Sequence, residues 1–125
     1  MIPISNTFSS FSTNDLDKTL EFYTHILGIE VKTGPVGMPE LQLPGGLKVG
    51  VYQKDNHVPA DFTVLNLMVD DVEASVDELN ELGIEMEKYE GFNQDEKGIA
   101  RVDGRPPAAW FTDPGKNVIS LFQNE

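Results

Sequence analysis

Residues 8–31 read FSSFSTNDLDKTLEFYTHILGIEV, and residues 64–86 repeat the same pattern as VLNLMVDDVEASVDELNELGIEM. When the two stretches are aligned, Asp15 falls on Asp71, and the apolar residues that follow them coincide. A duplicated unit of this kind has to bury an apolar face against its copy. The repeat therefore predicts a domain that is built from two similar modules.

The end of each copy repeats as well. A Pro-Gly pair at residues 44–45 precedes the alternating run 49–53, and the same pair at residues 114–115 precedes the run 119–123. Proline presets the first angle of a type II turn and glycine accepts the positive second angle, so we expect this turn in both copies. Each copy is then predicted to be one strand, one helix and three further strands.

These boundaries give a single domain over residues 1–125, with module 1 at about 5–53, a polar connector at 54–61 and module 2 at about 62–125. The second copy is longer, and the extra residues fall in 88–107, an insertion of unassigned role that we expect to contain a loop or hairpin. Helix N-caps are predicted at Asn14 and Asp70, and glycine stops at Gly28 and Gly83. The predicted strands are 7–13, 29–33, 40–43, 47–53, 63–69, 84–87 and 117–123.

Composition restricts the partners. Twenty-one acidic against nine basic residues give a net charge of −12, concentrated between Asp70 and Glu90, and such a surface repels a phosphate backbone. The chain has no cysteine, which removes disulfides, thiolate nucleophiles and cysteine-ligated metals. It also lacks a secretory signal and any run of about 20 apolar residues. We expect a cytoplasmic protein that binds neither nucleic acid nor membrane.

The chain resembles the vicinal oxygen chelate superfamily, the group of glyoxalase I, bleomycin-resistance proteins and extradiol dioxygenases. The resemblance implies an α+β fold of two tandem βαβββ modules that form a curved mixed sheet around a ligand cleft, and it implies a homodimer. The residues that carry it are Asp15-Leu16, Glu21-Phe22-Tyr23, Leu27-Gly28, Val69-Asp70-Asp71-Val72, Leu82-Gly83 and Trp110-Phe111-Thr112-Asp113-Pro114.

One motif departs from the family pattern. The family usually ends with an Asp-Pro-x-Gly-Asn turn, whereas this chain has Asp113-Pro114-Gly115-Lys116-Asn117, with the glycine one place early. We expect this difference to change the turn type and to leave the fold unchanged.

The resemblance also allows a test for a metal. Metal-dependent relatives carry a His, Glu or Gln ligand early in the first strand and within the last strand of each module. These positions map to Phe8, Gly50, Val64 and Ser120, none of which is a usual ligand. The two histidines fall elsewhere, His25 on a solvated helix face and His57 in the connector, so we expect no metal and no other cofactor.

Strand alternation assigns the side chains that would line the cleft. The candidate ligand-binding residues are Phe8, Ser10, Gly50, Tyr52, Val64, Asn66, Met68, Arg101, Trp110, Ser120 and Phe122, and Ser12 shares their strand phase. The opposite phase is almost wholly aliphatic, as expected for the side beneath the helices. An anionic group could pair with Arg101 or with Arg105. Alternatively, the apolar members fill a collapsed cleft or a dimer seam, both arginines form surface ion pairs, and Trp110 belongs to the core.

The leading hypothesis is a metal-free glyoxalase/bleomycin-resistance-like protein that binds a small, partly aromatic organic molecule. One alternative is a metal-dependent lyase, isomerase or dioxygenase with non-standard ligands. Another is a non-catalytic interaction or regulatory domain. The sequence assigns no catalytic residue, and whether the protein is an enzyme stays open at this point.

Overall fold

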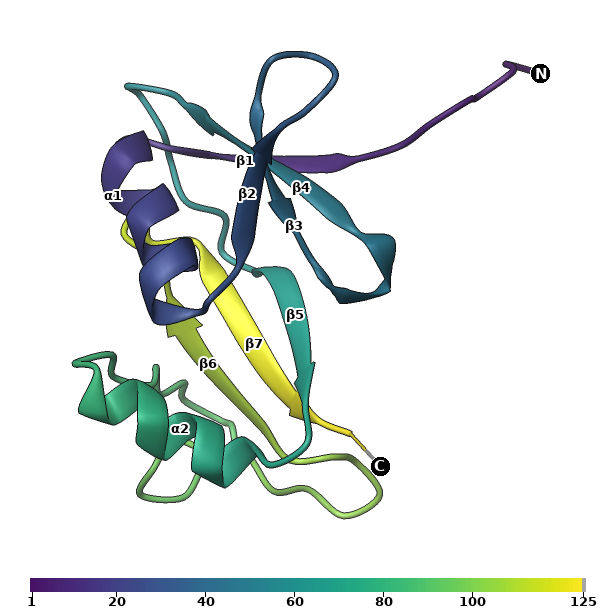
Figure 1. The fold of residues 1–125 in the computed structure, drawn as a ribbon. Helices are drawn as coiled ribbons and strands as arrows, with labels where there is room; N and C mark the ends of the chain where they lie inside the picture. The colour runs from purple at the N-terminus through teal and green to yellow at the C-terminus, as the bar shows by residue number, and fades with distance from the viewer. Residues whose placement is uncertain (125) are drawn as a thin grey trace. The chain divides into compact units, whose positions relative to one another are not determined.

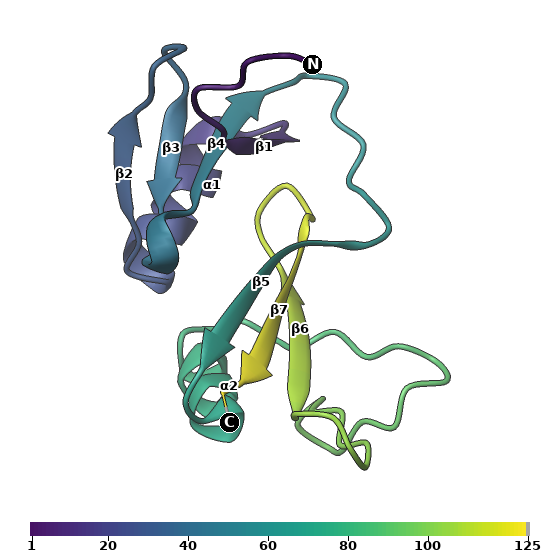
Figure 2. The same ribbon diagram turned by 90° about the vertical axis from the view of Figure 1, so that its right-hand side faces the viewer.

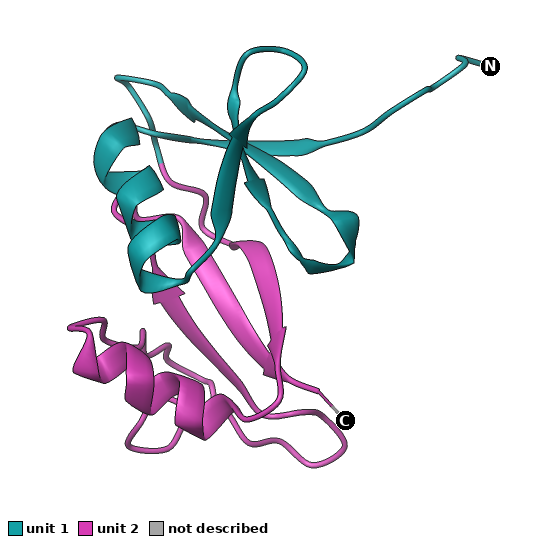
Figure 3. Ribbon diagram, viewed as in Figure 1, with its two compact units in different colours: residues 1–58 teal, residues 59–125 magenta. Residues whose placement is uncertain are grey.

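The computed structural model describes residues 1–124. They divide into two compact units, residues 1–58 and residues 59–124 (Figure 3). The division falls inside the connector that was expected at residues 54–61. None of the helices among the described residues is long and apolar enough to cross a membrane.

Unit 1 carries a four-stranded sheet and one helix (Figure 1). Its strands are β1 (Ser9–Thr13), β2 (Glu30–Thr33), β3 (Pro39–Gln42) and β4 (Lys48–Gln53), in the spatial order β1-β4-β3-β2. Strands β1 and β4 run parallel, and the other neighbours are antiparallel. Helix α1 (Leu16–Glu21) continues as a π-helical turn, η1 (Phe22–Ile26), and η2 (Pro44–Gly46) is a short 3-10 turn.

Unit 2 repeats this plan with three strands. They are β5 (Thr63–Val69), β6 (Ala108–Thr112) and β7 (Val118–Gln123), in the order β5-β7-β6, with β5 parallel to β7. Helix α2 (Val72–Glu81) packs against β6 and β7. Two helices and two small sheets confirm the predicted α+β class.

The strand registers repeat as the sequence does. Ser10 pairs with Gly50 between β1 and β4, and Asn66 pairs with Ser120 between β5 and β7. Residues that the sequence repeat aligns at the beginning and at the end of the two copies are thus paired in the same way within each sheet.

The strand predicted at residues 84–87 is wrong. This segment has no regular structure. Its Glu87 N–H donates to the Trp110 carbonyl of β6 at 2.7 Å, in the place where β2 pairs with β3 in unit 1. In unit 1 a five-residue loop holds the two strands together, whereas in unit 2 the insertion separates the segment from β6. Figure 2 shows this long irregular connection between α2 and β6.

Both helix caps lie one residue later than predicted. Asp15 accepts a hydrogen bond from the Lys18 N–H at 3.2 Å, and Asp71 accepts one from the Ala74 N–H at 3.0 Å. The predicted caps were therefore the residues just before the true ones. Both glycine stops are confirmed, because Gly28 and Gly83 have positive φ angles of 68° and 86°.

The two Pro-Gly turns differ. In the first copy the positive φ falls on Gly45, at 81°, as a type II turn requires. In the second copy it falls on Lys116, at 66°, the place where the family pattern has glycine. The type II turn predicted for the second copy is therefore wrong, whereas the strand pairing on both sides of β7 is intact.

Candidate functional site

Burial alternates in the predicted phase along β1 and β5, whereas in β4 and β7 the candidate positions Gly50 and Ser120 are buried like their neighbours. In unit 1, Phe11 and Val51 are buried while Ser10 and Tyr52 are exposed. In unit 2 the same contrast separates the buried Leu65, Ile119 and Leu121 from the exposed Asn66 and Met68. Each sheet therefore has an aliphatic side that packs in its unit's core and a second side that carries the candidate residues.

In unit 1 the candidate residues lie close together but leave little room at Gly50. A Cβ added to Gly50 would overlap the thioether sulfur of Met38, and it would lie 3.7 Å from the ring of Phe8. Ser10 pairs with Gly50 in register, and Tyr52 follows two residues along β4. The position that the resemblance assigns to a metal ligand is thus covered by a neighbouring side chain.

Glu40 lies on this same side of the unit 1 sheet, because it pairs with Gly50 between β3 and β4. Its side chain is only 2% exposed, and Oε2 has no hydrogen-bond partner among the described residues. The carboxyl group packs directly against Gly34, where any added Cβ would overlap it. The sequence analysis did not single out Glu40. Its position in the predicted strand 40–43 was a signal that its carboxyl group lies on the sheet.

His57 reaches further than expected. Its Nδ1 lies 2.6 Å from the Ser12 Oγ, so the connector residue contacts a side chain in the candidate strand phase. His25, in contrast, is exposed as predicted, with its Nδ1 4.0 Å from a carboxylate oxygen of Glu21.

In unit 2 the candidate residues on the sheet lie opposite one another on neighbouring strands. The Ser120 Oγ is fully buried and donates to the Asn66 Oδ1 at 2.5 Å, so both groups are already engaged with each other. Trp110 pairs with Ser120 between β6 and β7, and Met68 pairs with Phe122 between β5 and β7. Val64 lies at an irregularity of the β5–β7 register.

Three aromatic rings gather where the insertion meets β6. The ring centroids of Tyr89 and Phe92 lie 5.5 Å apart, those of Tyr89 and Trp110 5.8 Å, and those of Phe92 and Trp110 5.1 Å, all edge-to-face. This geometry is favourable for aromatic pairs. Burial raises the pKa of the Tyr89 phenol above its ordinary value, and the Glu87 carboxylate adds to the rise. The phenol is therefore neutral at physiological pH.

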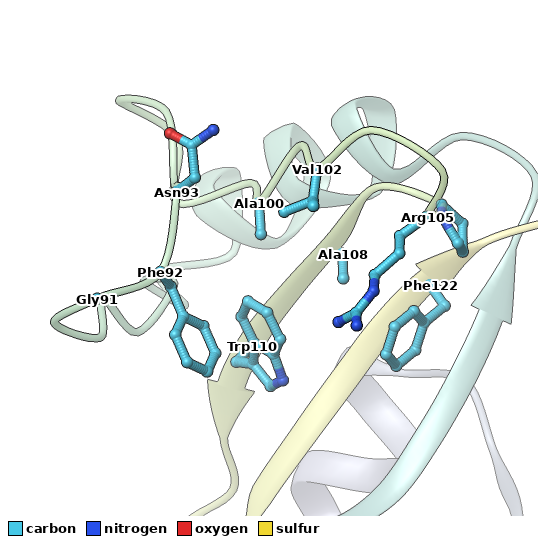
Figure 4. Close-up of a pocket in the computed structure, with 10 residues that line it drawn as sticks. Gly91, Phe92, Asn93, Ala100, Val102, Arg105, Ala108, Trp110 and Phe122 are labelled. Atoms are coloured by element: carbon cyan, nitrogen blue, oxygen red, sulfur yellow. The ribbon is translucent and has the colours of Figure 1, made fainter.

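A cavity of about 510 Å³ opens beside this cluster (Figure 4). Its rings are Phe92, Trp110 and Phe122, and Figure 4 shows Arg105 extending toward the gap between the last two. The remaining walls are small or aliphatic apart from one amide, and they comprise Gly91, Asn93, Ala100, Val102, Pro106 and Ala108. Apolar walls with few polar groups, in this range of volume, are typical of small-molecule sites.

A second cavity, of about 490 Å³, lies against the same aromatic cluster. It shares the rings of Phe92 and Trp110 with the first and adds Tyr89 and Phe62. Its one charged lining residue is Asp61, so the two cavities have ionisable groups of opposite sign.

Gln94 positions the insertion. Its side-chain amide donates to the carbonyl groups of Glu87 at 2.9 Å and Gly98 at 2.8 Å, and its carbonyl oxygen accepts from the Tyr89 N–H at 2.8 Å. The bridge between Gln94 and Ala100 makes residues 95–98 a hairpin tip within the insertion, where the sequence predicted a loop or hairpin. One side chain thus holds the start, middle and tip of the segment that supplies Phe92.

Ion pairs tie the hairpin tip to its surroundings. Lys97 Nζ lies 2.9 Å from Asp77 and 3.3 Å from Glu73 on α2, and hydrogen bonds to these carboxylates raise the pKa of Lys97. Arg101 pairs with Asp95 at 3.3 Å. Burial alone would raise the pKa of Asp95, but hydrogen bonds from the Ile99 and Lys97 N–H groups and from Arg101 hold it below its usual range.

The structure thus brings two of the predicted residues, Trp110 and Phe122, to one cavity in unit 2. It places Arg101 in an ion pair, and Arg105 at the cavity instead. Phe92 and Gln94 both fall in the 88–107 insertion, and no pattern in the sequence showed that Phe92 lines the cavity and that Gln94 holds the insertion by hydrogen bonds. Among the described residues, no group of three or more His, Asp or Glu side chains is suitably placed to hold a metal ion.

Comparison with known families adds one sequence match. The family model described as "Glyoxalase/Bleomycin resistance protein/Dioxygenase superfamily" matches residues 7–121. No curated protein matches the chain in a direct sequence comparison.

Several solved structures share the fold. The fosfomycin resistance protein FosX of Listeria monocytogenes superposes with a TM-score of 0.73 at 16% identity, covering 99% of this chain and 96% of that one. The antibiotic-binding protein TnmS3 of Streptomyces sp. CB03234 gives 0.68 at 23% identity, with both chains fully covered. A lactoylglutathione lyase of Agrobacterium tumefaciens gives 0.68 at 17% identity, covering 98% of this chain and 96% of that one.

Proposed function

Since this chain belongs to the glyoxalase/bleomycin resistance protein/dioxygenase superfamily, we propose that it binds a small, partly aromatic organic molecule without the help of a metal ion. The observation that carries this proposal is the cavity of about 510 Å³ with Phe92, Trp110 and Phe122 in its walls. A planar ligand can stack on these rings, and each ring presents a large apolar surface at a small entropic cost.

Two of the structural relatives support this kind of function by their names. TnmS3 is an antibiotic-binding protein, and FosX is a fosfomycin resistance protein. Binding or disposing of a small organic compound is therefore compatible with the fold of this chain.

The side chains at the four mapped metal positions do not fit a divalent ion. Phe8, Gly50 and Val64 have no donor atom, and the hydroxyl of Ser120 is engaged with Asn66 at 2.5 Å. Carboxylate or imidazole ligands would be needed at these places for a site of ordinary affinity. Binding through the aromatic cavity requires none of them.

We further propose that the protein acts as a homodimer. Several large apolar side chains are exposed, among them Phe62 at 66%, Met68 at 58% and Phe92 at 52%. A second copy would remove such surface from water. Sedimentation equilibrium tests this, and a monomer at micromolar concentration would refute it.

The binding proposal can be tested with N-phenyl-1-naphthylamine, a neutral aromatic probe whose fluorescence rises in apolar sites. Trp110 is the single tryptophan of the chain and stands in the cavity wall, so energy transfer from it reports a probe bound nearby. We expect saturable quenching of Trp110 that weakens about tenfold in Phe122→Ala, as the loss of one buried ring contact predicts.

Tyr52→Ala in unit 1 is the matched control, since it removes an exposed aromatic side chain that does not line this cavity. It should leave the affinity unchanged. Absence of saturable quenching, or an equal loss in both variants, would refute the proposed site.

One observation favours a second candidate, an enzyme that uses a divalent metal with non-standard ligands. The buried carboxyl group of Glu40 has no hydrogen-bond partner at Oε2 among the described residues, and one similar FosX structure is a complex with Mn(II). Metal analysis of the purified protein distinguishes the two candidates. A stoichiometric ion that is lost in Glu40→Gln would favour the enzyme over the metal-free binding protein.

A further inference from the structure

We propose that the ligand of the 510 Å³ cavity carries an anionic group, which pairs with Arg105 while its aromatic part lies against Trp110 and Phe122. This inference rests on the proposed binding function and names the chemical class of the ligand. The sequence left Arg101 and Arg105 as alternatives, and the structure distinguishes them.

Arg105 has no carboxylate partner within the described residues, although acidic groups outnumber basic ones in this chain. Its guanidinium forms none of the ion pairs of unit 2, whereas Arg101 pairs with Asp95, and Lys97 with both Glu73 and Asp77. An arginine that is left unpaired on so acidic a protein retains its donors for another anion. Its planar fork suits a carboxylate, sulfonate or phosphate group.

The lining of the cavity agrees with this assignment. Arg105 is the one ionisable residue in its walls, so an anion there meets no opposing carboxylate. The neighbouring cavity, in contrast, carries Asp61. An aromatic anion that reaches the shared wall of Phe92 and Trp110 is therefore attracted to one side of it and repelled from the other.

The backbone around Arg105 is constrained. The Arg105 N–H donates to the Val102 carbonyl at 3.1 Å, and Gly104 has a φ of 80°, which fixes a tight turn. Two prolines, Pro106 and Pro107, follow and lead directly into β6. Because proline restricts the backbone, the arginine is held near the cavity before a ligand arrives.

A pair of probes tests the proposal. 1-Anilinonaphthalene-8-sulfonate has the ring frame of N-phenyl-1-naphthylamine with one sulfonate added. At low salt we expect the anionic probe to bind about three- to tenfold more tightly, the range for one partly exposed charge-assisted pair. The preference should shrink in 0.5 M NaCl. The net charge of −12 disfavours anions everywhere else, so general electrostatics cannot produce it.

Arg105→Gln should abolish the preference and leave binding of the neutral probe intact. Lys88→Gln removes the same charge from the insertion, where Lys88 contacts the Glu96 carbonyl, and it should preserve the preference. Equal affinity of the two probes, or a larger loss in Arg101→Gln than in Arg105→Gln, would overturn the inference while the binding function stands. If neither probe quenches Trp110, the binding function itself fails.

Discussion

Each unit begins with a strand and a helix, and in each unit the first strand pairs in parallel with the last. The two units differ in the segment that connects the helix to the last strand. In unit 1 a tight loop joins β2 to β3, and the Gly34 N–H donates to the Met38 carbonyl at 2.8 Å. In unit 2 residues 88–107 replace that loop, and the strand before them is lost. Figures 1 and 2 show the hairpin of one unit and the irregular path of the other.

This difference decides which unit holds the proposed site. The short loop of unit 1 packs closely on its own sheet, with Met38 of the loop over Gly50 of β4 and Gly34 of the loop against Glu40 of β3. The long insertion of unit 2 stands away from the sheet and encloses a cavity with it, to which it contributes Phe92 and Arg105. Loops on a constant scaffold commonly provide function in this way.

The largest expected effect comes from removing the clamp of the insertion. Gln94→Ala deletes three hydrogen bonds to backbone groups, so we expect a loss of about 2–3 kcal/mol in the free energy of unfolding. Urea denaturation followed by Trp110 fluorescence measures it. Asn93→Ala is the control, because its exposed amide makes one bond, to the Arg101 carbonyl at 3.1 Å, and should cost below about 1 kcal/mol. Equal losses would mean that the insertion is not held by Gln94.

A second prediction concerns the tight loop of unit 1. Gly34→Ala places a methyl group on the buried Glu40 carboxyl group, and we expect a cost of about 1–3 kcal/mol. In the Glu40→Ala background the same substitution should cost less than about 0.5 kcal/mol, because the overlapping group is gone. A double-mutant cycle in urea gives the coupling energy. An unchanged cost in both backgrounds would contradict the packing described here.

The capping aspartates test what the units share. Asp15→Ala and Asp71→Ala each remove one side-chain bond to a helix N-terminus, and each should cost about 1 kcal/mol. Asn14→Ala, one position earlier, should change the free energy of unfolding by less than about 0.5 kcal/mol. Thermal and urea unfolding of the three variants decide the matter. A larger loss of stability at Asn14 than at Asp15 would mean that Asn14 is the cap, as the sequence predicted.

The smallest effect is expected at the repeated turn. Lys116 has a φ of 66°, a conformation that costs a side-chain-bearing residue about 1 kcal/mol relative to glycine. Lys116→Gly should therefore raise the free energy of unfolding by about 0.5–1 kcal/mol. Lys116→Ala keeps the Cβ and should give no gain. A stabilisation of equal size in both variants would trace the effect to the lost charge instead.

Much of this fold was predictable because duplication checks itself. Each pairing in the first copy, such as Ser10 with Gly50, forecasts one in the second, Asn66 with Ser120. The errors were local. The helix caps were predicted one residue early, because Asn14 and Asp70 are also good capping residues and stand directly before the true caps. The segment 84–87 meets β6 through the bond from the Glu87 N–H to the Trp110 carbonyl and does not form a strand ladder with it, which a local pattern does not reveal.

The candidate site was less predictable, because it depends on a loop that folds back. Alternation placed Phe122 in the candidate phase, and Trp110 pairs with Ser120 on that side of the sheet. It could not place Phe92 against Trp110 at 5.1 Å, since that contact depends on the bonds of Gln94. Strand alternation also could not show which arginine is paired, because the ion pair of Arg101 with Asp95 depends on how the insertion folds.

The packing of Met38 over Gly50 has a consequence for the history of this chain. By resemblance, position 50 is where metal-dependent relatives carry a ligand, and here even a single carbon atom on it would overlap a neighbouring side chain. A side chain at this position therefore requires the thioether end of Met38 to move aside or to be replaced. Under the proposed metal-free function, a return to metal binding at position 50 depends on a second residue of the same sheet as well as on the ligand itself.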